Sequence, residues 1–291
     1  MLSKTLLACG LGSIALACAL PTPTWALDGR HTSETNVRCG QVIYRSIKLA
    51  NDLHNCVGNG LEVGASNITI DLNGHTIDGS GTASGIDNTS EGLSRTGHSR
   101  VTIKNGTVTG FASGVSLANG ADRNLVQRIL ATANGGAGIS ARNVDRPYIS
   151  DSAAIGDLVG FRLDSVTNAH IERSTALNNT GNGILLTGTS RGTVLHRNSV
   201  VNNNGDGILV TATVTGTRID NNDANGNGTR IPREDGIDVD ATDAATVIRD
   251  NRARNNGDYG IEATPGVTDG GGNRASGNGN SAQCLNITCT P

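Results

Sequence analysis

The fold is decided by the stretch Gly183-Ile-Leu-Leu and by its equivalents further along the chain, Gly207-Ile-Leu-Val, Gly236-Ile-Asp-Val and Gly260-Ile-Glu-Ala. Each stretch is a glycine followed by an apolar residue, a variable residue and a second apolar residue. The motif occurs eight times, and a ninth copy at Gly85 departs only at its last position. The nine glycines follow one another at intervals of 22 to 29 residues, which indicates a protein built from stacked repeats. The other motif glycines are Gly60, Gly114, Gly138 and Gly160.

A second set of positions has the same period. Five apolar or aromatic residues lie 12 residues before the next motif glycine: Val126, Tyr148, Ile171, Leu195 and Ile248. Three residues after these come Ile129, Asp151, Ser174, Asn198 and Asn251. The spacing predicts three short strands in each coil, with alternate side chains pointing into a shared core. We expect a tight turn at the position of Asn251, where asparagine tolerates a left-handed backbone and can hydrogen-bond to the next coil.

These repeats predict an all-β fold, a single-stranded right-handed parallel β-helix (a solenoid) of about ten coils. Leucine-rich repeats have a similar period but require leucine at fixed positions, which here hold glycine, threonine and alanine. Calcium-binding nonapeptide rolls need tandem Gly-Gly-x-Gly-x-Asp, which residues 270–280 imitate only in composition. The expected order along the chain is a signal peptide at residues 1–26, an N-terminal cap and first coil at 27–59, β-helix repeats at 60–273 and a C-terminal cap at 274–291.

The first 26 residues have the composition of an export signal. Lys4 precedes an apolar run from Leu6 to Leu20, and Ala26 ends a small-residue cleavage site. A lipoprotein signal around Cys18 is a weaker alternative. Because no later segment contains about 18 consecutive apolar residues, we expect a secreted or periplasmic protein without a membrane span. The net charge of −3 argues against a nucleic-acid partner, because binding nucleic acid needs a basic face. We also expect the protein to be a monomer.

Four cysteines lie beyond the predicted signal peptide, two near each end of the chain: Cys39, Cys56, Cys284 and Cys289. An even number in an exported chain predicts two local disulfides, Cys39–Cys56 and Cys284–Cys289. A zinc site is the alternative, but its ligands would lie at opposite ends of a long solenoid. The six histidines are scattered without metal-ligand spacing, so no transition-metal site is predicted.

Two early segments carry a resemblance to a known family. They are Asn67-Ile-Thr-Ile-Asp-Leu-Asn-Gly-His-Thr-Ile-Asp-Gly79 and Val101-Thr-Ile-Lys-Asn-Gly-Thr-Val108. They resemble the opening coils of exported bacterial right-handed β-helix proteins of the pectate-lyase-like superfamily, and the resemblance covers roughly residues 39–280. It implies the fold and a polymer-binding groove along the first strand of each coil. It leaves activity open, because that superfamily contains lyases, hydrolases, epimerases, accessory proteins and adhesins.

The residue two places after each motif glycine should point outward into that groove. These residues are Glu62, Asp87, Ser116, Ser140, Arg162, Leu185, Leu209, Asp238 and Glu262. Since coils rise by about 4.8 Å, Asp238 and Glu262 should be neighbours, with Asp240 beside them. Carboxylates that close repel each other and raise one pKa, so that an acid and a base can coexist. Asp238, Glu262 and Asp240 are therefore the candidate catalytic residues.

The candidate substrate-binding residues are arginines. A long insertion at residues 227–235 would bring Arg230 and Arg233 to the rim of the same carboxylates, and Arg162 lies further along the groove. Each feature also has a plainer explanation. Outward acids are usually a solvated face, long solenoid loops often vary neutrally, and Arg162 with Asp164 can belong to a ladder of surface ion pairs.

Four aspartates recur in the loop that returns the chain to the motif glycine: Asp157, Asp206, Asp235 and Asp258. They can bind calcium, although aspartate is also a common turn residue. No other cofactor is predicted.

Two functions remain in view. The resemblance implies signatures for the family's enzymes that are absent here: Asn-Thr-Asp, Asp-Asp and Gly-His-Gly of polygalacturonases, Asp-Pro-His of mannuronan epimerases and Trp-Ile-Asp-His of pectate lyases. Aromatic residues make up only 2% of the chain, so a glycan would be held by charge and hydrogen bonds. We therefore favour a non-catalytic surface or periplasmic binding or scaffold protein. The alternative is a carbohydrate-active enzyme, a hydrolase or lyase, and in both cases the expected partner is an acidic polysaccharide or cell-surface glycan.

Overall fold

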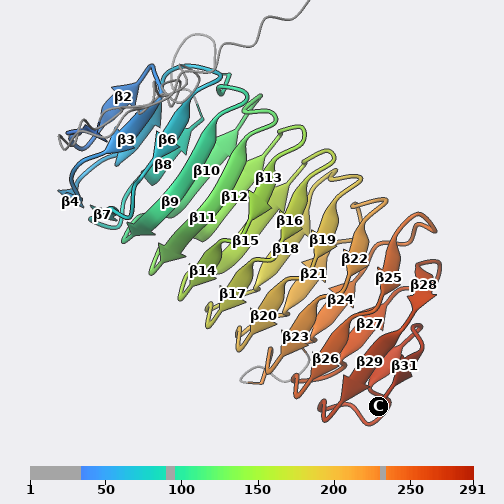
Figure 1. Cartoon of the computed structure of the whole chain (residues 1–291). Coiled ribbons are helices and arrows are strands. Elements are labelled where there is room, and N and C mark those ends of the chain that lie inside the picture. Colours follow the sequence, from blue (N-terminus) through green and yellow to red (C-terminus); the bar gives the residue numbers. More distant parts are fainter. Residues whose placement is uncertain (1–33, 90–95, 230–233) are drawn as a thin grey trace, which may run out of the picture. The chain divides into compact units, whose positions relative to one another are not determined.

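The computed structural model describes residues 34–89, 96–229 and 234–291, and these residues form strands and turns but no helix. The described part is a solenoid in which the chain winds through successive coils (Figure 1). All paired strands are parallel to their neighbours, so the predicted right-handed parallel β-helix of about ten coils is confirmed. The predicted signal peptide, residues 1–26, lies outside the described residues. Within them, no helix long and apolar enough to cross a membrane is found.

One strand of each coil belongs to an 11-stranded sheet. Its strands are β2 (Gln41–Ile43), β5 (Leu61–Val63), β8 (Ser84–Asn88), β10 (Ser113–Ala118), β12 (Ala137–Arg142), β15 (Val159–Asp164), β18 (Ile184–Thr187), β21 (Ile208–Val210), β24 (Ile237–Val239), β27 (Ile261–Ala263) and β30 (Cys284–Leu285).

The other two strands of each coil form two rows of a 20-stranded sheet. One row contains β1 (Glu34–Thr35), β3 (Ile47–Leu49), β6 (Thr69–Asp71), β13 (Tyr148–Ser150), β16 (His170–Glu172), β19 (Val194–His196), β22 (Arg218–Asp220), β25 (Val247–Arg249) and β28 (Thr268–Gly271). The other contains β4 (Leu53–Cys56), β7 (Thr76–Gly79), β14 (Ala153–Ile155), β17 (Thr175–Leu177), β20 (Ser199–Val201), β23 (Asp223–Asn225), β26 (Arg252–Arg254), β29 (Asn273–Ser276) and β31 (Cys289–Thr290). Two long strands, β9 (Thr102–Thr109) and β11 (Leu125–Thr132), take part in both rows.

The core follows from the alternation of side chains along each strand. In β18, Ile184 and Leu186 are fully buried while Leu185 between them faces outward and is half-buried. Residues of this kind stack from coil to coil into one continuous apolar cluster. The widest side chains in it are Phe111 and Phe161. A single coil could not bury these residues, so each coil depends on its neighbours for stability.

The motif glycines are required because neighbouring backbones approach closely. A Cβ on Gly207 would lie 2.4 Å from the carbonyl oxygen of Gly236 in the next coil and 2.7 Å from Nδ2 of Asn227. A Cβ on Gly236 would meet Nδ2 of Asn256 at 2.5 Å and the carbonyl oxygen of Gly260 at 2.6 Å. Contacts this short do not occur between real atoms, which explains why the motif always opens with glycine.

A ladder of buried side chains joins the coils at the turn between the two rows of the 20-stranded sheet. Oδ1 of Asn222 accepts the N–H of Asn198 at 2.9 Å, and Oδ1 of Asn251 accepts the N–H of Asn222 at 2.9 Å. The predicted hydrogen bonding between stacked asparagines is therefore confirmed. The members of this ladder are Ser152, Ser174, Asn198, Asn222, Asn251 and Asn273.

The predicted backbone shape of this turn was wrong in one respect. The left-handed residue is Asp250, with φ of 55°, and not Asn251. The equivalent position is Arg173 in one coil and Arg197 in another, with φ of 48° and 55°. The asparagine is therefore needed for its hydrogen bonds, whereas the preceding residue carries the backbone strain.

A second ladder, which the sequence reasoning missed, follows the last strand of each coil. Oδ1 of Asn203 accepts the N–H of Asn179 at 3.0 Å, and Oδ1 of Asn227 accepts the N–H of Asn203 at 3.1 Å. Its members are Asn134, Asp157, Asn179, Asn203, Asn227, Asn256 and Asn278. The signal for it was the recurrence of asparagine about 24 residues apart in segments that look like ordinary polar loops.

The register predicted for one coil was wrong by one residue. Val126 pairs with Ile149, and Ile149 pairs with Ile171, so Ile149 rather than Tyr148 faces the core. Tyr148 lies on the outer face and stacks on His170, with ring centroids 5.6 Å apart. The coil is one residue shorter than the fixed 12-residue spacing assumed.

Both predicted disulfides are present. Cys39 is bonded to Cys56 and Cys284 to Cys289, with Cα atoms 5.4 Å and 6.2 Å apart. Each closes a short loop near one end of the described solenoid.

We expect Gly207→Ala to lower the free energy of unfolding by about 1–3 kcal/mol, because its methyl group collides with backbone and with a buried amide. Chemical denaturation followed by far-UV circular dichroism measures the change. Gly58→Ala is the matched control, since a Cβ there meets nothing within 4 Å. Equal losses for both variants would contradict the close-approach explanation.

Candidate functional site

The outward row predicted from the motif is present in the 11-stranded sheet. Successive members pair in register, for example Ser116 with Ser140, Ser140 with Arg162, and Asp238 with Glu262. On the other side of Asp238, its partner is Leu209 of the preceding strand β21. The row therefore passes from hydroxyl groups through a cation and apolar side chains to carboxylates.

The carboxylates at the far end of the row form a tight cluster. One carboxylate oxygen from each of Asp206, Asp235 and Asp238 lies within 4.8 Å of the other two. Asp206 and Asp235 are buried and Asp238 is half-buried, with Glu262 paired to Asp238. We call Asp206, Asp235, Asp238 and Glu262 the acidic cluster.

Burial is the main reason why these acids are hard to ionise. Burial, together with the smaller effects of the charges of Asp240, Glu262 and Glu234, raises the pKa of Asp238 to about 7. Burial likewise raises the pKa of Asp206, with smaller contributions from Glu234 and Asp238. The pKa of Asp235 is raised for the same reason. The group at Asp238 is therefore close to half-protonated at neutral pH.

The positions of Asp206 and Asp235 follow from the sequence. Each directly precedes a motif glycine, so the two occupy the same place in consecutive coils. Oδ1 of Asp206 accepts the N–H of Asp235 at 2.7 Å, and Oδ1 of Asp235 accepts the N–H of Tyr259 at 2.6 Å. These bonds fix the two carboxylates at a place where one oxygen of each lies within 4.8 Å of an oxygen of Asp238.

The geometry of the acidic cluster fits a calcium ion. Ca²⁺ binds oxygen at about 2.3–2.6 Å, so ligand oxygens around one ion lie within about 5 Å of each other. Asp206, Asp235 and Asp238 satisfy this condition. The other two aspartates of the sequence prediction are placed elsewhere, because Asp157 belongs to the second asparagine ladder and Asp258 accepts a hydrogen bond from Asn280.

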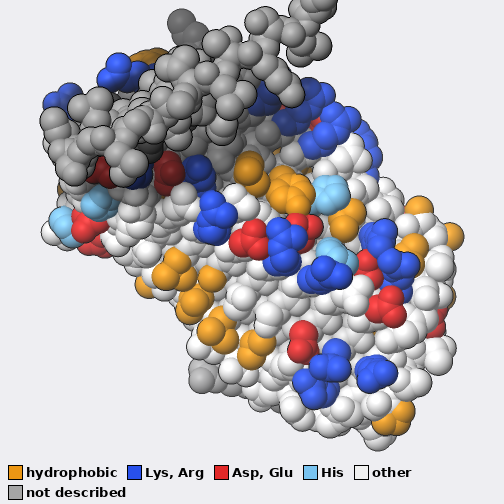
Figure 2. All heavy atoms as spheres, viewed as in Figure 1, with side chains coloured by type: hydrophobic (Ala, Val, Ile, Leu, Met, Phe, Trp, Pro, Cys, Tyr) orange, Lys and Arg blue, Asp and Glu red, His pale blue; other side chains and the backbone are white. Residues whose placement is uncertain are grey.

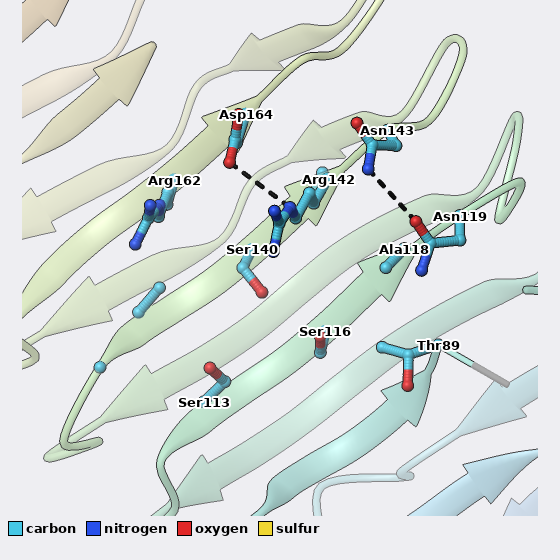
Figure 3. A pocket seen from close by; sticks show the side chains of 13 residues that line it. Thr89, Ser113, Ser116, Ala118, Asn119, Ser140, Arg142, Asn143, Arg162 and Asp164 are labelled. Atoms are coloured by element: carbon cyan, nitrogen blue, oxygen red, sulfur yellow. Dashed lines mark hydrogen bonds and ion pairs between the residues drawn. The ribbon is translucent and has the colours of Figure 1, made fainter. Parts of the chain in front are cut away.

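A cavity of about 610 Å³ lies over β10, β12 and β15, and Arg162 lines it (Figure 3). Ser116 and Ser140 lie along its floor, and Arg142 forms an ion pair with Asp164 at 3.6 Å. The other lining residues are Thr89, Ser113, Ala118, Asn119, Gly136, Ala137, Ala141 and Asn143. The sequence allowed Arg162 and Asp164 to belong to a ladder of surface ion pairs, but Asp164 pairs with Arg142 instead. No carboxylate among the described residues lies within 4.0 Å of Arg162.

The predicted site residues are therefore only partly brought together. Asp238 and Glu262 pair directly, and the exposed Asp240 raises the pKa of Asp238. Arg162 is three strands from Asp238 along the sheet, roughly 14 Å at the usual strand spacing. Arg230 and Arg233 lie outside the described residues.

A second charged cluster, on the 20-stranded sheet, was not singled out from the sequence. Asp220 is 1% exposed, and its carboxylate pairs with Arg218 at 2.6 Å, with Arg249 at 3.2 Å and with His196 at 3.2 Å. Burial opposes its ionisation, but hydrogen bonds from the two arginines outweigh burial and hold the pKa of Asp220 below its usual value. The charge of the buried Asp220 is therefore compensated within the sheet by the two arginines, and removing them would leave a buried charge unpaired.

Comparison with known proteins identifies the family. The family described as right handed beta helix region matches residues 49–224. The chain belongs to this family. A comparison of this β-helix protein with curated proteins finds no match.

Several solved structures share the fold of this β-helix protein. The A-module of the mannuronan C-5 epimerase AlgE6 of Azotobacter vinelandii is 16% identical, with a TM-score of 0.59 over 85% of this chain and 71% of that one. An alginate lyase of Paenibacillus sp. str. FPU-7 is 13% identical, with a TM-score of 0.60 over 87% and 97%. The periplasmic alginate epimerase AlgG is 14% identical, with a TM-score of 0.56 over 85% and 75%. At these identities the likeness concerns the fold alone.

The acidic cluster makes stability depend on pH. Because the folded pKa values of Asp206, Asp235 and Asp238 exceed those of unfolded aspartate, their contribution to stability is complete below about pH 4 and is lost as the pH rises toward 9. We expect Asp235→Asn, which keeps the acceptor for Tyr259, to raise the melting temperature at pH 9 relative to the parent chain. Asp78→Asn, which removes a carboxylate from β7, is the control. Equal losses of stability from pH 5 to pH 9 in the parent and Asp235→Asn chains would contradict the assignment.

The same cluster predicts a response to calcium. Calcium chloride should raise the melting temperature of the parent chain at pH 8 more than magnesium chloride does, because the closely spaced oxygens suit the larger ion. Asp206→Asn and Asp235→Asn should lose this increase. A melting temperature that calcium leaves unchanged would exclude the ion from the acidic cluster.

Proposed function

We propose that this β-helix protein binds an acidic polysaccharide along the outer face of its 11-stranded sheet, without transforming it. The observation that carries the proposal is Arg162, an exposed guanidinium in the 610 Å³ cavity with no carboxylate within 4.0 Å among the described residues. An exposed cation in a polar groove is suited to the carboxylate of a uronic acid, which a guanidinium can bind through two parallel hydrogen bonds.

The rest of the cavity suits a sugar ring bound through its hydroxyl groups. Ser116, Ser113 and Thr89 offer hydroxyls, and Asn119 and Asn143 offer amides that are hydrogen-bonded to each other at 3.2 Å. None of the described residues that line the cavity is aromatic, so among them stacking contributes little to recognition. The solved structures of similar fold include proteins named for mannuronan and alginate, which supports an acidic polysaccharide as the ligand class.

We further propose that the protein acts in the periplasm or outside the cell. Two disulfides, at Cys39–Cys56 and Cys284–Cys289, favour an oxidising compartment. Lys4 near the start of the sequence and the apolar run that follows it fit an export signal.

A second candidate function is catalysis on the same polymer. It is favoured by the pair Asp238–Glu262, because a carboxyl group with a pKa of about 7 can donate a proton at neutral pH while a neighbouring carboxylate accepts one. In this reaction Asp238 would act as the acid, Glu262 as the base or nucleophile, and Asp240 would maintain the raised pKa of Asp238.

Binding tests the first proposal. Affinity electrophoresis or calorimetry with polyuronates such as alginate and polygalacturonate should show binding to the parent chain. Arg162→Gln should weaken it about 3- to 10-fold, as expected for one exposed ion pair. Arg45→Gln, which removes an equally exposed charge between β2 and β3, should leave affinity unchanged. Equal affinity of the Arg162→Gln and parent chains would overturn the groove assignment.

Turnover tests the second candidate. If the pair is catalytic, Asp238→Asn and Glu262→Gln should each lower the release of reducing ends or unsaturated products by about 100-fold or more. Asp238→Asn should also keep or raise the melting temperature at pH 8, because it removes like-charge repulsion. Asp78→Asn is the control. No turnover of any polyuronate by the parent chain would leave binding as the function.

A further inference from the structure

The described surface carries a cluster of three arginines on the 20-stranded sheet, away from the groove. Arg252 and Arg254 lie two residues apart on β26, so both side chains point to the outer face. Arg274 on β29 pairs in register with Arg252, and Ser276 pairs with Arg254. Figure 2 shows Lys and Arg side chains gathered over this part of the sheet, near the C-terminal end in Figure 1.

These arginines form a shallow pocket. Arg252, Arg254 and Arg274 are exposed, and together with Ser276 and Pro291 they line a cavity of about 210 Å³. β26 and β29 belong to the 20-stranded sheet, whereas Arg162 lies on the 11-stranded sheet. The arginine pocket is therefore separate from the proposed polysaccharide groove.

The three guanidinium groups of the pocket form no ion pair within the described part of the chain. There, no carboxylate lies within 4.0 Å of the three guanidinium groups, and none of them donates a side-chain hydrogen bond. The nearest acid along the column is Asp223, which pairs in register with Arg252. Its Oδ1 accepts a hydrogen bond from Asn225 at 2.6 Å. Other arginines of the same sheet differ, since Arg218 and Arg249 both bind the buried Asp220.

Uncompensated like charges on neighbouring strands are unfavourable. Cations directly opposite each other, as Arg252 and Arg274 are, destabilise a strand pair. The three side chains are exposed and do not belong to the apolar core. Packing in the core therefore does not explain why three arginines lie together here. A bound anion would attract all three guanidinium groups and so offset their mutual repulsion.

We propose that Arg252, Arg254 and Arg274 form a binding site for a sulfate or phosphate group carried by a larger ligand. Three guanidinium forks offer more donors than the two oxygens of a carboxylate can accept, whereas an esterified sulfate or phosphate presents three terminal oxygens. The hydroxyl of Ser276 adds a fourth side chain that can donate a hydrogen bond. The exposed, shallow form of the pocket suits a group that projects from a polymer or from a headgroup rather than a free small molecule.

Binding to the full chain tests the site. Isothermal titration with dextran sulfate and with a polyphosphate should show binding that weakens with increasing sodium chloride. The triple variant Arg252→Gln, Arg254→Gln, Arg274→Gln should bind at least one of the two polymers about tenfold more weakly, with a shallower salt dependence. The polymer that loses more affinity identifies the source of the group, sulfate ester or phosphate.

The controls separate this site from the groove. Arg45→Gln, which removes an exposed charge outside both sites, should bind dextran sulfate and polyphosphate like the parent chain, and the triple variant should bind alginate like the parent chain. Circular dichroism of the triple variant should match that of the parent chain, and its melting temperature without added anion should stay equal or rise. If the triple variant binds both polyanions as tightly as the parent chain, or if the parent chain binds neither, the site does not exist.

Discussion

The structure depends on the hydrogen bonds that one coil provides to the backbone of the next. At each of two turns, a buried asparagine Oδ1 accepts an N–H from the preceding coil, as Asn222 does from Asn198 and Asn227 from Asn203. A turn inside a solenoid has no water to satisfy its N–H groups, and an unsatisfied buried donor costs about 1–3 kcal/mol. The ladders therefore permit tight turns in the interior of a protein whose strands are only a few residues long.

The close contact between coils also explains why glycine opens each motif and why the carboxylates of the acidic cluster lie together. The asparagine amides occupy the space where a Cβ on a motif glycine would lie, as Asn227 does beside Gly207. Because the backbone at each motif glycine is held against the next coil, the residues on either side of it recur at fixed places. Asp206 and Asp235 lie directly before such glycines, which is why their carboxylates stack beside Asp238 rather than dispersing into solvent.

Periodicity in the sequence was sufficient to predict the fold and the pairing of Asp238 with Glu262, and the grouping of two cysteines near each end was sufficient to predict both disulfides. These features depend on spacing, and spacing is visible in a single chain. What the sequence could not predict depends on contacts between coils. Ile149 replaces Tyr148 in the core because one coil is a residue shorter, and a fixed spacing cannot detect this change. Asp206 lies in a turn and Asp238 lies on a strand, and neither local pattern indicates that the two carboxylates come together. Their proximity could therefore not be predicted from the sequence.

The composition of the ladders also varies along the solenoid. An asparagine such as Asn198 accepts from the coil before it and donates Nδ2 both to the carbonyl oxygen of Ile171 in that coil and to Asn222 in the next. Ser152 instead donates its hydroxyl within its own coil, and Asp157 has no amide to donate.

Ser152 and Asp157 stand in the same coil, so the ladder residues of this coil donate no side-chain amide to either neighbouring coil. Burial raises the pKa of Asp157 to about 6, and its Oδ2 has no hydrogen-bond partner. Cohesion between coils is therefore uneven: an asparagine such as Asn203 donates its amide to both neighbouring coils, so the asparagine-rich coils further along are more strongly crosslinked than the coil that holds Ser152 and Asp157.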